Sequence, residues 1–394
     1  MPPSTSHVLF TAVRPDLVLR HGHGDYVFDD AERRYLDFVQ GWAVNALGHS
    51  PLQVRQALAA QSKKLVHGSA GFFNEAQLAL ADALCARTGF ARAITFCSGA
   101  EANESAIKLA RTVGARRGAG TIITTLNSFH GRTLATMSAS GKASFAALFE
   151  PKVAGFRKVP YGDIEAMEAA LDNDVAAVML EPIQGEAGVV VPPPAYLPAV
   201  RALTRARGIL LIADEVQTGM GRTGSLLACE KAGIQADIVT LGKGLGAGVP
   251  VSAMLCNAEL DCFSPGEQGG THTGHPLLSA VALAVLEVVS TPAFLADVLA
   301  KGARVAAILT QIAAALPHAE VRGQGLLWAL VLGETCAQEV ADEARSLGLL
   351  VNAPQSNVLR FMPALNVEDA AISAFGALLR DAIARVPRLR LSQI

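Results

Sequence analysis

The stretch that decides the fold reads Ile209-Leu-Leu-Ile-Ala-Asp214-Glu-Val-Gln217 and continues, further on, as Asp237-Ile-Val-Thr-Leu-Gly-Lys243-Gly-Leu-Gly-Ala-Gly248. Each of its two short apolar runs ends at or next to one charged residue, Asp214 or Lys243. Buried strands of an open α/β sheet present reactive groups at their carboxyl ends in this way. The pattern therefore predicts an α/β fold in which Asp214 and Lys243 face one crevice.

Lys243 stands among glycines at positions 242, 244, 246 and 248, so backbone or a flat ligand could approach its ammonium group closely. Such a lysine either holds phosphate as a fixed charge or is desolvated until its neutral amine can form a Schiff base with a carbonyl. The spacing of a P-loop is absent, and Gly244 rather than Ser or Thr follows the lysine. On this segment alone, a surface lysine in a flexible glycine loop explains the residues equally well.

The composition favours a large enzyme with small-molecule partners. The chain has 394 residues, of which 51% are hydrophobic, and this length suits about two or three domains. A net charge of -2 does not indicate the excess of positive charge that is typical of proteins that bind nucleic acid. No apolar stretch suits secretion or membrane spanning, so a cytoplasmic location is expected. The six cysteines form no C-x-x-C pair, which indicates reduced thiols and no metal site.

Further segments supply candidate binding residues at the ends of predicted strands. The strand at 93–97 runs directly into a helix from Ser98 to Arg111. Free backbone N–H groups of Ser98, Gly99 and Ala100 at this junction could cradle a phosphate, although ordinary helix capping explains the same residues. A long helical stretch from Pro276 to Leu316 is expected to break near Pro292, and Asn366 with Asp369 is expected to cap the start of the last helix.

Two loops that follow strands carry aromatic and charged side chains. After the strand at 121–125, Phe129 could lie against a planar ligand and Arg132 could bind a carboxylate, although a polar turn with a core Phe is equally compatible. The buried strand at 175–180 ends in Glu181-Pro-Ile-Gln-Gly-Glu186. Either carboxylate needs a partner if it is buried, and Arg360 is a candidate for that partner.

The motifs together resemble the class III, or ω-amino-acid, aminotransferases that use pyridoxal phosphate, and within them the acetylornithine and succinylornithine enzymes. The resemblance covers nearly the whole chain. Its motifs are Gly41 to His49, Ser98-Gly-Ala-Glu-Ala-Asn-Glu, Phe129-His-Gly-Arg, Glu181-Pro-Ile-Gln-Gly-Glu, Asp214-Glu-Val-Gln, Gly219-Met-Gly-Arg-Thr-Gly224, Gly242-Lys243 and Val358-Leu-Arg-Phe-Met-Pro363.

The resemblance implies fold type I of the pyridoxal-phosphate transferases. In that fold a large domain holds a mainly parallel seven-stranded sheet between helices, beside a smaller α+β domain. The expected division is residues 1–49 for the N-terminal part of the small domain, 50–290 for the large cofactor-binding domain and 291–394 for the rest of the small domain. A homodimer with shared active sites is also implied, since Thr271 resembles a threonine that reaches the phosphate of the neighbouring subunit.

The resemblance also implies roles for individual residues. Lys243 would bind pyridoxal 5'-phosphate covalently and Asp214 would pair with the protonated ring nitrogen, which keeps the ring electron-withdrawing. Gln217 would contact the ring hydroxyl and Phe129 would stack on the ring. Ser98 lies beside Gly99 and Ala100, whose N–H groups would bind the phosphate.

The implied reaction moves the ω-amino group of N-acetylornithine to 2-oxoglutarate by ping-pong kinetics and gives N-acetylglutamate semialdehyde and glutamate, a step of arginine biosynthesis. Arg132 would bind the α-carboxylate of the donor. Glu186 would neutralise Arg360 in one half-reaction and release it for 2-oxoglutarate in the other. Succinylornithine, ornithine and 4-aminobutyrate stay open as donors.

Two departures from the family pattern lie near the expected substrate channel. His272, Thr273 and His275 replace Tyr, Gly and Asn in the loop that holds Thr271. Trp42 replaces a smaller aliphatic residue or a tyrosine, and it could narrow the pocket or stack on an acyl group. From its own segment alone, Trp42 is interpreted as a core residue rather than as a pocket wall. A catalytically silent binding relative, an aminomutase and a decarboxylase are the alternatives from other functional classes.

Overall fold

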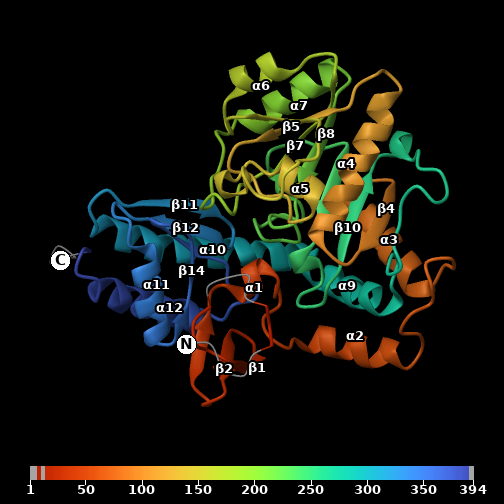
Figure 1. Cartoon of the computed structure of the whole chain (residues 1–394). Coiled ribbons are helices and arrows are strands. Elements are labelled where there is room, and N and C mark those ends of the chain that lie inside the picture. The colour runs from red at the N-terminus through yellow and green to blue at the C-terminus, as the bar shows by residue number, and fades with distance from the viewer. Residues whose placement is uncertain (1–6, 10–13, 390–394) are drawn as a thin grey trace.

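The computed structural model describes residues 7–9 and 14–389, which form three β-sheets and the helices that pack on them (Figure 1). The largest sheet has seven strands, and the two pairings of β10 are its antiparallel ones. This confirms the predicted mainly parallel sheet. In spatial order the strands are β4 (Arg92–Phe96), β10 (Ser252–Cys256), β9 (Ile238–Leu241), β8 (Leu210–Asp214), β7 (Val175–Leu180), β5 (Thr121–Thr125) and β6 (Phe156–Val159).

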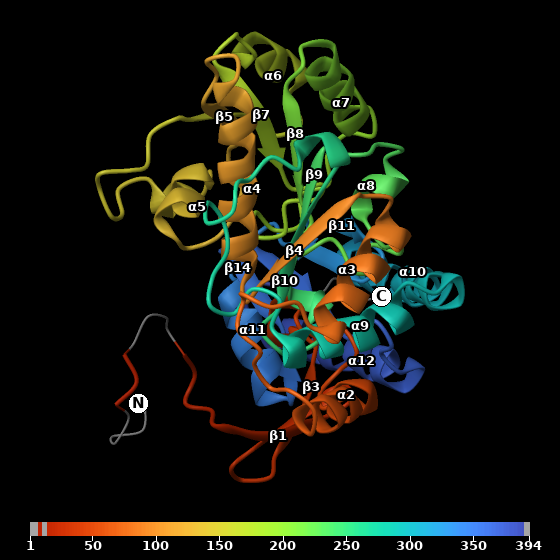
Figure 2. The ribbon, with the colours of Figure 1, turned by 90° about the vertical axis from the view of Figure 1, so that its right-hand side faces the viewer.

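Strand β7 shows why the sheet is buried on both faces. Successive side chains of a strand point to opposite faces, and all six residues of β7 are buried. Ala177 and Met179 belong to the apolar cluster that includes helix α4 (Gly99–Ala115). Val178 and Leu180 belong to the cluster that includes α7 (Tyr196–Ala206). Helix α4 therefore covers one face of the sheet, along which it runs in Figure 2.

Four further helices connect the central sheet with the rest of the chain. Helices α2 (Leu52–Ser62) and α3 (Glu75–Thr88) pack against α9 (Pro276–Val289), and α10 (Pro292–Ala314) follows α9. The predicted break near Pro292 is confirmed, because the side chain of Thr291 accepts a hydrogen bond from the N–H of Phe294 and starts a new helix. None of the helices in the described residues is by itself long and apolar enough to cross a membrane; α9 and α10 together reach that length and composition, with a bend of 71° between them.

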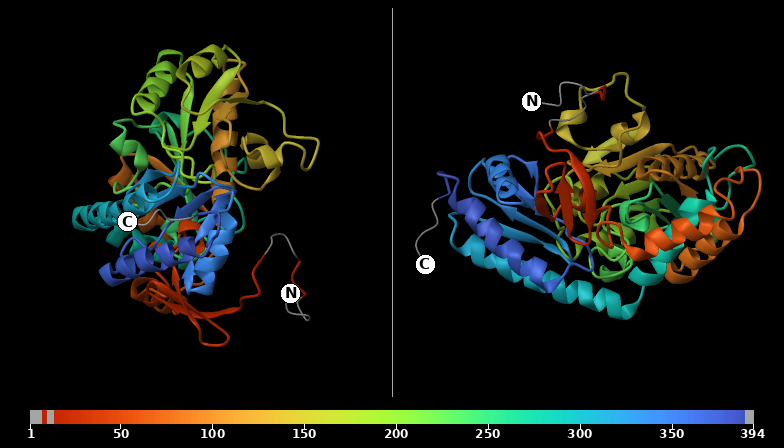
Figure 3. Two further views of the ribbon diagram at one scale, coloured as in Figure 1. Left: turned by 90° about the vertical axis from the view of Figure 1, so that its left-hand side faces the viewer. Right: turned by 90° about the horizontal axis from the view of Figure 1, so that it is seen from below.

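One of the other two sheets joins the N-terminal part of the chain to its C-terminal part, and the other belongs to the C-terminal part alone. One consists of β1 (Leu19–His23), β2 (Tyr26–Asp29), β3 (Arg34–Asp37) and β13 (Leu349–Leu350), and β13 pairs in parallel with β3. The other consists of β11 (Glu320–Gln324), β12 (Leu327–Val331), β15 (Val358–Phe361) and β14 (Asn352–Gln355). Figure 3 shows the N-terminal strands beside the C-terminal helices α11 (Ala337–Ser346) and α12 (Asp369–Ala384). The domain boundaries given above stay a prediction.

The remaining elements are short, and one predicted helix start is wrong. They are α1 (Gln40–Ala43), α5 (Leu134–Ala139), α6 (Ile164–Ala170), α8 (Ala228–Lys231) and the 3-10 turns η1 (Ala143–Phe145), η2 (Lys243–Leu245) and η3 (Ala258–Leu260). Asn366 does not cap the last helix; Glu368 occupies that position without a side-chain cap. The N–H of Glu368 instead donates to Asp25 Oδ2, so a contact with the distant N-terminal part fixes where the helix begins.

Candidate active site

A cavity of about 270 Å³ lies beyond the carboxyl ends of β7, β8 and β9. This volume is close to the lower end of the range for small-molecule sites, roughly 300–1,000 Å³. Asp214 and Lys243 both line it, together with residues from α4 and from three loops. The lining residues are Gly99, Ala100, Asn103, Phe129, His130, Gly131, Arg132, Glu181, Glu186, Asp214, Val216, Gln217 and Lys243.

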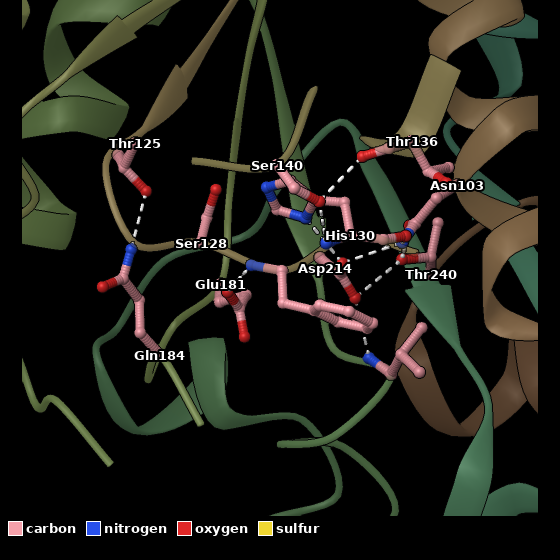
Figure 4. Close-up of polar contacts among 12 residues, drawn as sticks. Asn103, Thr125, Ser128, His130, Thr136, Ser140, Glu181, Gln184, Asp214 and Thr240 are labelled. Carbon is pink, nitrogen blue, oxygen red and sulfur yellow. Dashed lines mark hydrogen bonds and ion pairs between the residues drawn. The ribbon is translucent and has the colours of Figure 1, made fainter. Parts of the chain in front are cut away.

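The carboxylate of Asp214 is buried and held by three short hydrogen bonds, two of which Figure 4 shows with their labelled donors. His130 Nδ1 lies 2.7 Å and Asn103 Nδ2 2.8 Å from Asp214 Oδ2. The backbone N–H of Val216 donates to Oδ1 at 3.1 Å. A buried carboxylate is unfavourable unless such donors satisfy it, so these contacts hold Asp214 in place.

The donors to Asp214 are themselves fixed by a further set of hydrogen bonds. Asn103 Nδ2 also donates to the carbonyl of His130 at 2.7 Å, and Asn103 Oδ1 accepts from Thr240 Oγ1 at 2.7 Å. The N–H of His130 donates to Ser140 Oγ at 2.8 Å (Figure 4). Sequence reasoning assigned no role to Asn103, His130 or Thr240. The sequence offered one signal for such roles: Asn103 is a polar residue on the buried face of a helix, and Thr240 is a polar residue near the end of a buried strand.

Lys243 stands in a strained backbone conformation next to the cavity. Its φ angle is 41°, which non-glycine residues adopt rarely and mostly at functional sites. Burial, and then the charge of Arg360, lower the pKa of its ammonium, while Glu186 and Asp214 oppose this effect. A lowered pKa raises the fraction of neutral amine, which is the nucleophilic and proton-accepting form.

Glu181 connects the loop of Phe129 with the end of β7. Its Oε1 accepts a hydrogen bond from the N–H of Phe129 at 2.9 Å, and its carbonyl accepts one from Tyr161 Oη at 2.8 Å. Burial raises the pKa of Glu181 to about 7. These contacts hold the Phe129 ring at the wall of the cavity.

Glu186 and Arg360 form an ion pair, with Nη2 of the arginine 2.8 Å from Oε1 of the glutamate. Arg360 is fully buried on β15 and donates to Asn352 Oδ1 through Nε at 3.0 Å and Nη2 at 2.7 Å. Its Nη1 donates to Gln217 Oε1 at 3.4 Å. Burial opposes ionisation of Glu186, but the charges of Arg360 and Lys243 outweigh burial and lower its pKa. The candidate partner of Arg360 is thus Glu186 rather than Glu181.

The predicted phosphate cradle and the predicted carboxylate-binding arginine lie at two other walls of the cavity. Gly99 and Ala100 line it at the start of α4, where the first N–H groups of a helix have no intrahelical acceptor. Ser98 does not line it; its Oγ caps α4 by accepting from the N–H of Glu101. Arg132 is exposed at the rim, with its guanidinium carbon 5.8 Å from the centroid of the Phe129 ring.

Like Ser98 and Arg360, the predicted residues Trp42 and Thr271 do not line the cavity of the same chain. Trp42 is 55% exposed, so its interpretation as a core residue is wrong. Its φ angle of 60° lies in the left-handed region, and the side chain is not packed inside. Thr271 is exposed, and its carbonyl accepts from His67 Nε2 at 3.0 Å. The rings of His272 and His275 gather against the His67 ring, with centroids 5.4 and 5.3 Å away. Within the described residues, no group of three or more His, Cys, Asp or Glu could hold a metal ion.

Comparison with known proteins decides the family. The profile of the family Aminotransferase class-III matches residues 11–383. The chain belongs to the class III aminotransferases. It is 47% identical to an acetylornithine aminotransferase from Ralstonia nicotianae, over 95% of this chain and 96% of that relative. This aminotransferase is also similar to solved structures.

One of these is the N-acetylornithine aminotransferase from Stenotrophomonas maltophilia, with a TM-score of 0.82, 35% identity and coverage of 94% of this chain and 96% of that one. Another is an ornithine aminotransferase from Toxoplasma gondii with pyridoxal phosphate partly occupying its active site. It has a TM-score of 0.90, 32% identity and coverage of 95% and 92%. This chain is therefore a pyridoxal-phosphate-dependent transaminase.

The residues around the cavity fit that cofactor. The amide Nε2 of Gln217 and the ring Nε2 of His130 are buried without a hydrogen-bond partner. The first of these belongs to a lining residue and is an unused donor for an oxygen such as a ring hydroxyl. The side chain of Asp214 suits a ring nitrogen, and the lysine with lowered pKa suits an aldehyde. The free N–H groups of Gly99 and Ala100 suit a phosphate.

Proposed function

We propose that this aminotransferase moves the distal amino group of N-acetylornithine to 2-oxoglutarate in a ping-pong reaction, giving N-acetylglutamate semialdehyde and glutamate, as a step of arginine biosynthesis. The observation that carries the proposal is the ion pair between the buried Arg360 and Glu186, which lines the same cavity as Lys243. Together with Arg132 at the rim, it provides two arginines for carboxylates, one of them masked by Glu186. The acetylornithine aminotransferase from Ralstonia nicotianae supports the acetylated donor.

In this proposal the residues around the cofactor have separate tasks. When bound, pyridoxal phosphate supplies a ring that withdraws electrons from the carbon bearing the substrate amine. Lys243 binds the cofactor, and its freed amine moves a proton from that carbon as general base and then acid. Asp214 holds a proton at the ring nitrogen, Gln217 donates to the ring hydroxyl, and Phe129 stacks on the ring. Gly99 and Ala100, next to Ser98, bind the phosphate.

The two substrates use one pocket because the charge on Arg360 can be masked or exposed. Arg132 binds the α-carboxylate of N-acetylornithine, which directs the distal amine toward Lys243. Glu186 meanwhile neutralises Arg360. For 2-oxoglutarate, Glu186 leaves and Arg360 binds the α-carboxylate, so a shorter dicarboxylate presents its keto carbon at the same point.

We expect Arg360→Ala to impair the half-reaction with 2-oxoglutarate far more than the half-reaction with the donor. A charge-assisted hydrogen bond contributes roughly 1.5–3 kcal/mol, which corresponds to a loss of about 10- to 10²-fold in kcat/KM. The donor half-reaction should change less than about threefold, because Arg360 is masked there. The single-turnover rate with each substrate measures the effect on each half-reaction. Equal losses in the two half-reactions would contradict the switch, and a thermal unfolding scan controls for a damaged fold.

The amine donor can be identified from the absorbance of the cofactor in the holoenzyme. We expect N-acetylornithine to bleach the resting band and 2-oxoglutarate to restore it. Ornithine is the second candidate, because the chain matches the Toxoplasma gondii ornithine aminotransferase with a TM-score of 0.90. Bleaching by ornithine, succinylornithine or 4-aminobutyrate alone would keep the reaction type and replace the donor. A holoenzyme that no amine bleaches would instead favour a catalytically silent relative.

We further propose that the enzyme is a cytoplasmic homodimer with shared active sites, in which Thr271 reaches the phosphate bound by the neighbouring subunit. Trp42 and Thr271 are both exposed in the single chain and lie outside its own cavity, which supports a second copy as their partner. Trp42 would then lie near the substrate channel. Sedimentation equilibrium of the purified protein tests the dimer; a monomer that turns over at full rate would rule it out.

A further inference from the structure

Arg360 is held too firmly to move when one substrate replaces the other. It is fully buried, and Asn352 on the paired strand β14 accepts hydrogen bonds from its Nε and Nη2. Gln217 accepts from Nη1. Moving the guanidinium would break these bonds in a buried site, which is unfavourable. A substrate carboxylate can therefore bind Arg360 only when the carboxylate of Glu186 leaves it.

The backbone of Glu186 is held in place, so only its side chain can move. It lies in a loop closed by the backbone pair of Gln184 and Val190, and its carbonyl accepts a hydrogen bond from Gln355 Nε2 at 3.2 Å. Its side chain is 21% exposed. A carboxylate that leaves its arginine in such surroundings is unfavourable unless another cation receives it.

A second cation already lies next to the other oxygen of Glu186. Lys142 Nζ is 3.8 Å from Oε2, whereas Arg360 contacts Oε1. Among the described residues, these two are the cations within ion-pair distance of Glu186. The Lys142 side chain is 29% exposed, and it stands just before η1, with its Nζ 5.8 Å from the Phe145 ring centroid. The loop after α5 that carries it projects from the body of the protein (yellow in Figure 2).

We propose that Lys142 receives the carboxylate of Glu186 when a dicarboxylate substrate occupies Arg360. This inference rests on the proposed switch between Glu186 and Arg360. A turn of the carboxylate toward Lys142 keeps it paired while Arg360 becomes free, so Lys142 lowers the free energy needed to expose Arg360. Lys142 is thus a positioning residue that favours the dicarboxylate without touching it.

Loss of the Lys142 charge should therefore affect the dicarboxylate substrate more than the amine donor. Removing the charge of Lys142 should weaken the binding of a dicarboxylate about fivefold, which is the size of a partly exposed ion pair. The half-reaction with the donor should change less than about twofold, because Glu186 stays on Arg360 there.

The experiment compares Lys142→Gln, Lys142→Arg and Lys152→Gln in the holoenzyme. Lys152 is the matched control, because it also lies 3.8 Å from a glutamate oxygen, that of Glu150, but Glu150, unlike Glu186, does not line the cavity. Calorimetry gives the Kd of glutarate, a dicarboxylate that has no keto group to react, and stopped-flow absorbance gives each half-reaction. We expect weaker glutarate binding for Lys142→Gln only.

The double variant Lys142→Gln with Glu186→Gln separates this role from a structural one. Glu186→Gln alone should tighten glutarate binding, since Arg360 is then unmasked, and adding Lys142→Gln should change Kd less than about twofold. Unchanged binding in Lys142→Gln, or the same fivefold loss with and without Glu186, would overturn the role of Lys142. If Glu186→Gln fails to tighten glutarate binding, the switch in the proposed function fails instead, and the Lys142 proposal falls with it.

Discussion

Lys243→Ala is expected to lower turnover at least about 10⁴-fold. The substitution removes the covalent link to the cofactor and the general base together, and general acid–base catalysis alone contributes about 10²–10⁴-fold. The lowered pKa of Lys243, its left-handed backbone and its place on the cavity wall all point to this residue. Steady-state transamination with N-acetylornithine and 2-oxoglutarate measures the loss.

The variant should still fold and bind pyridoxal phosphate noncovalently, because Asp214, Gly99 and Ala100 remain. Reduction with borohydride followed by peptide mass spectrometry should label Lys243 in the parent protein and no lysine in the variant. Lys158→Ala is the matched control: burial also lowers the pKa of Lys158, but it does not line the cavity. Its turnover should stay within about twofold of the parent. A Lys243→Ala protein with normal turnover would refute the assignment.

The strands of the central sheet could be predicted closely because their burial produces continuous apolar runs. The expected ranges 121–125 and 175–180 coincide with β5 and β7. The helix after Ser98 begins where its local cap predicts, but it ends at Ala115 rather than at Arg111. Its end depends on packing against the sheet, which a single sequence does not encode locally.

Some residues of the candidate site could likewise be predicted from the sequence, and others could not. Asp214 and Lys243 could be placed at one cavity because both stand at strand ends, where the geometry of a parallel sheet brings them together. The donors that hold Asp214 could not be found, since Asn103 is 111 positions away and His130 is 84 positions away. The exposure of Trp42 could not be predicted, because an aromatic residue is usually buried and no local residue indicates the left-handed backbone at this position.

Asp214→Asn is expected to slow both half-reactions about 10³-fold. The change keeps the shape of the side chain but removes the charge that holds a proton at the ring nitrogen. A nearby opposite charge shifts a pKa by about 1–3 units. At 1.36 kcal/mol per unit, the upper end of that range is about 4 kcal/mol, which corresponds to about 10³ in rate. Unlike Arg360→Ala, this substitution should affect the donor and 2-oxoglutarate equally, because both depend on the same ring.

Asp237→Asn provides the control for a lost aspartate charge. Asp237 precedes β9 and forms two hydrogen bonds with Arg201 at 2.7 and 2.8 Å, but it does not line the cavity. Its loss should lower thermal stability and leave the single-turnover rates within about threefold. Asp214→Asn should show the reverse pattern: the rates fall while the cofactor stays bound through the phosphate and Lys243. If both variants lost rate equally, the effect at Asp214 would come from the fold rather than from a charge at the ring nitrogen. The buried bonds from His130 and Asn103 would then serve stability alone.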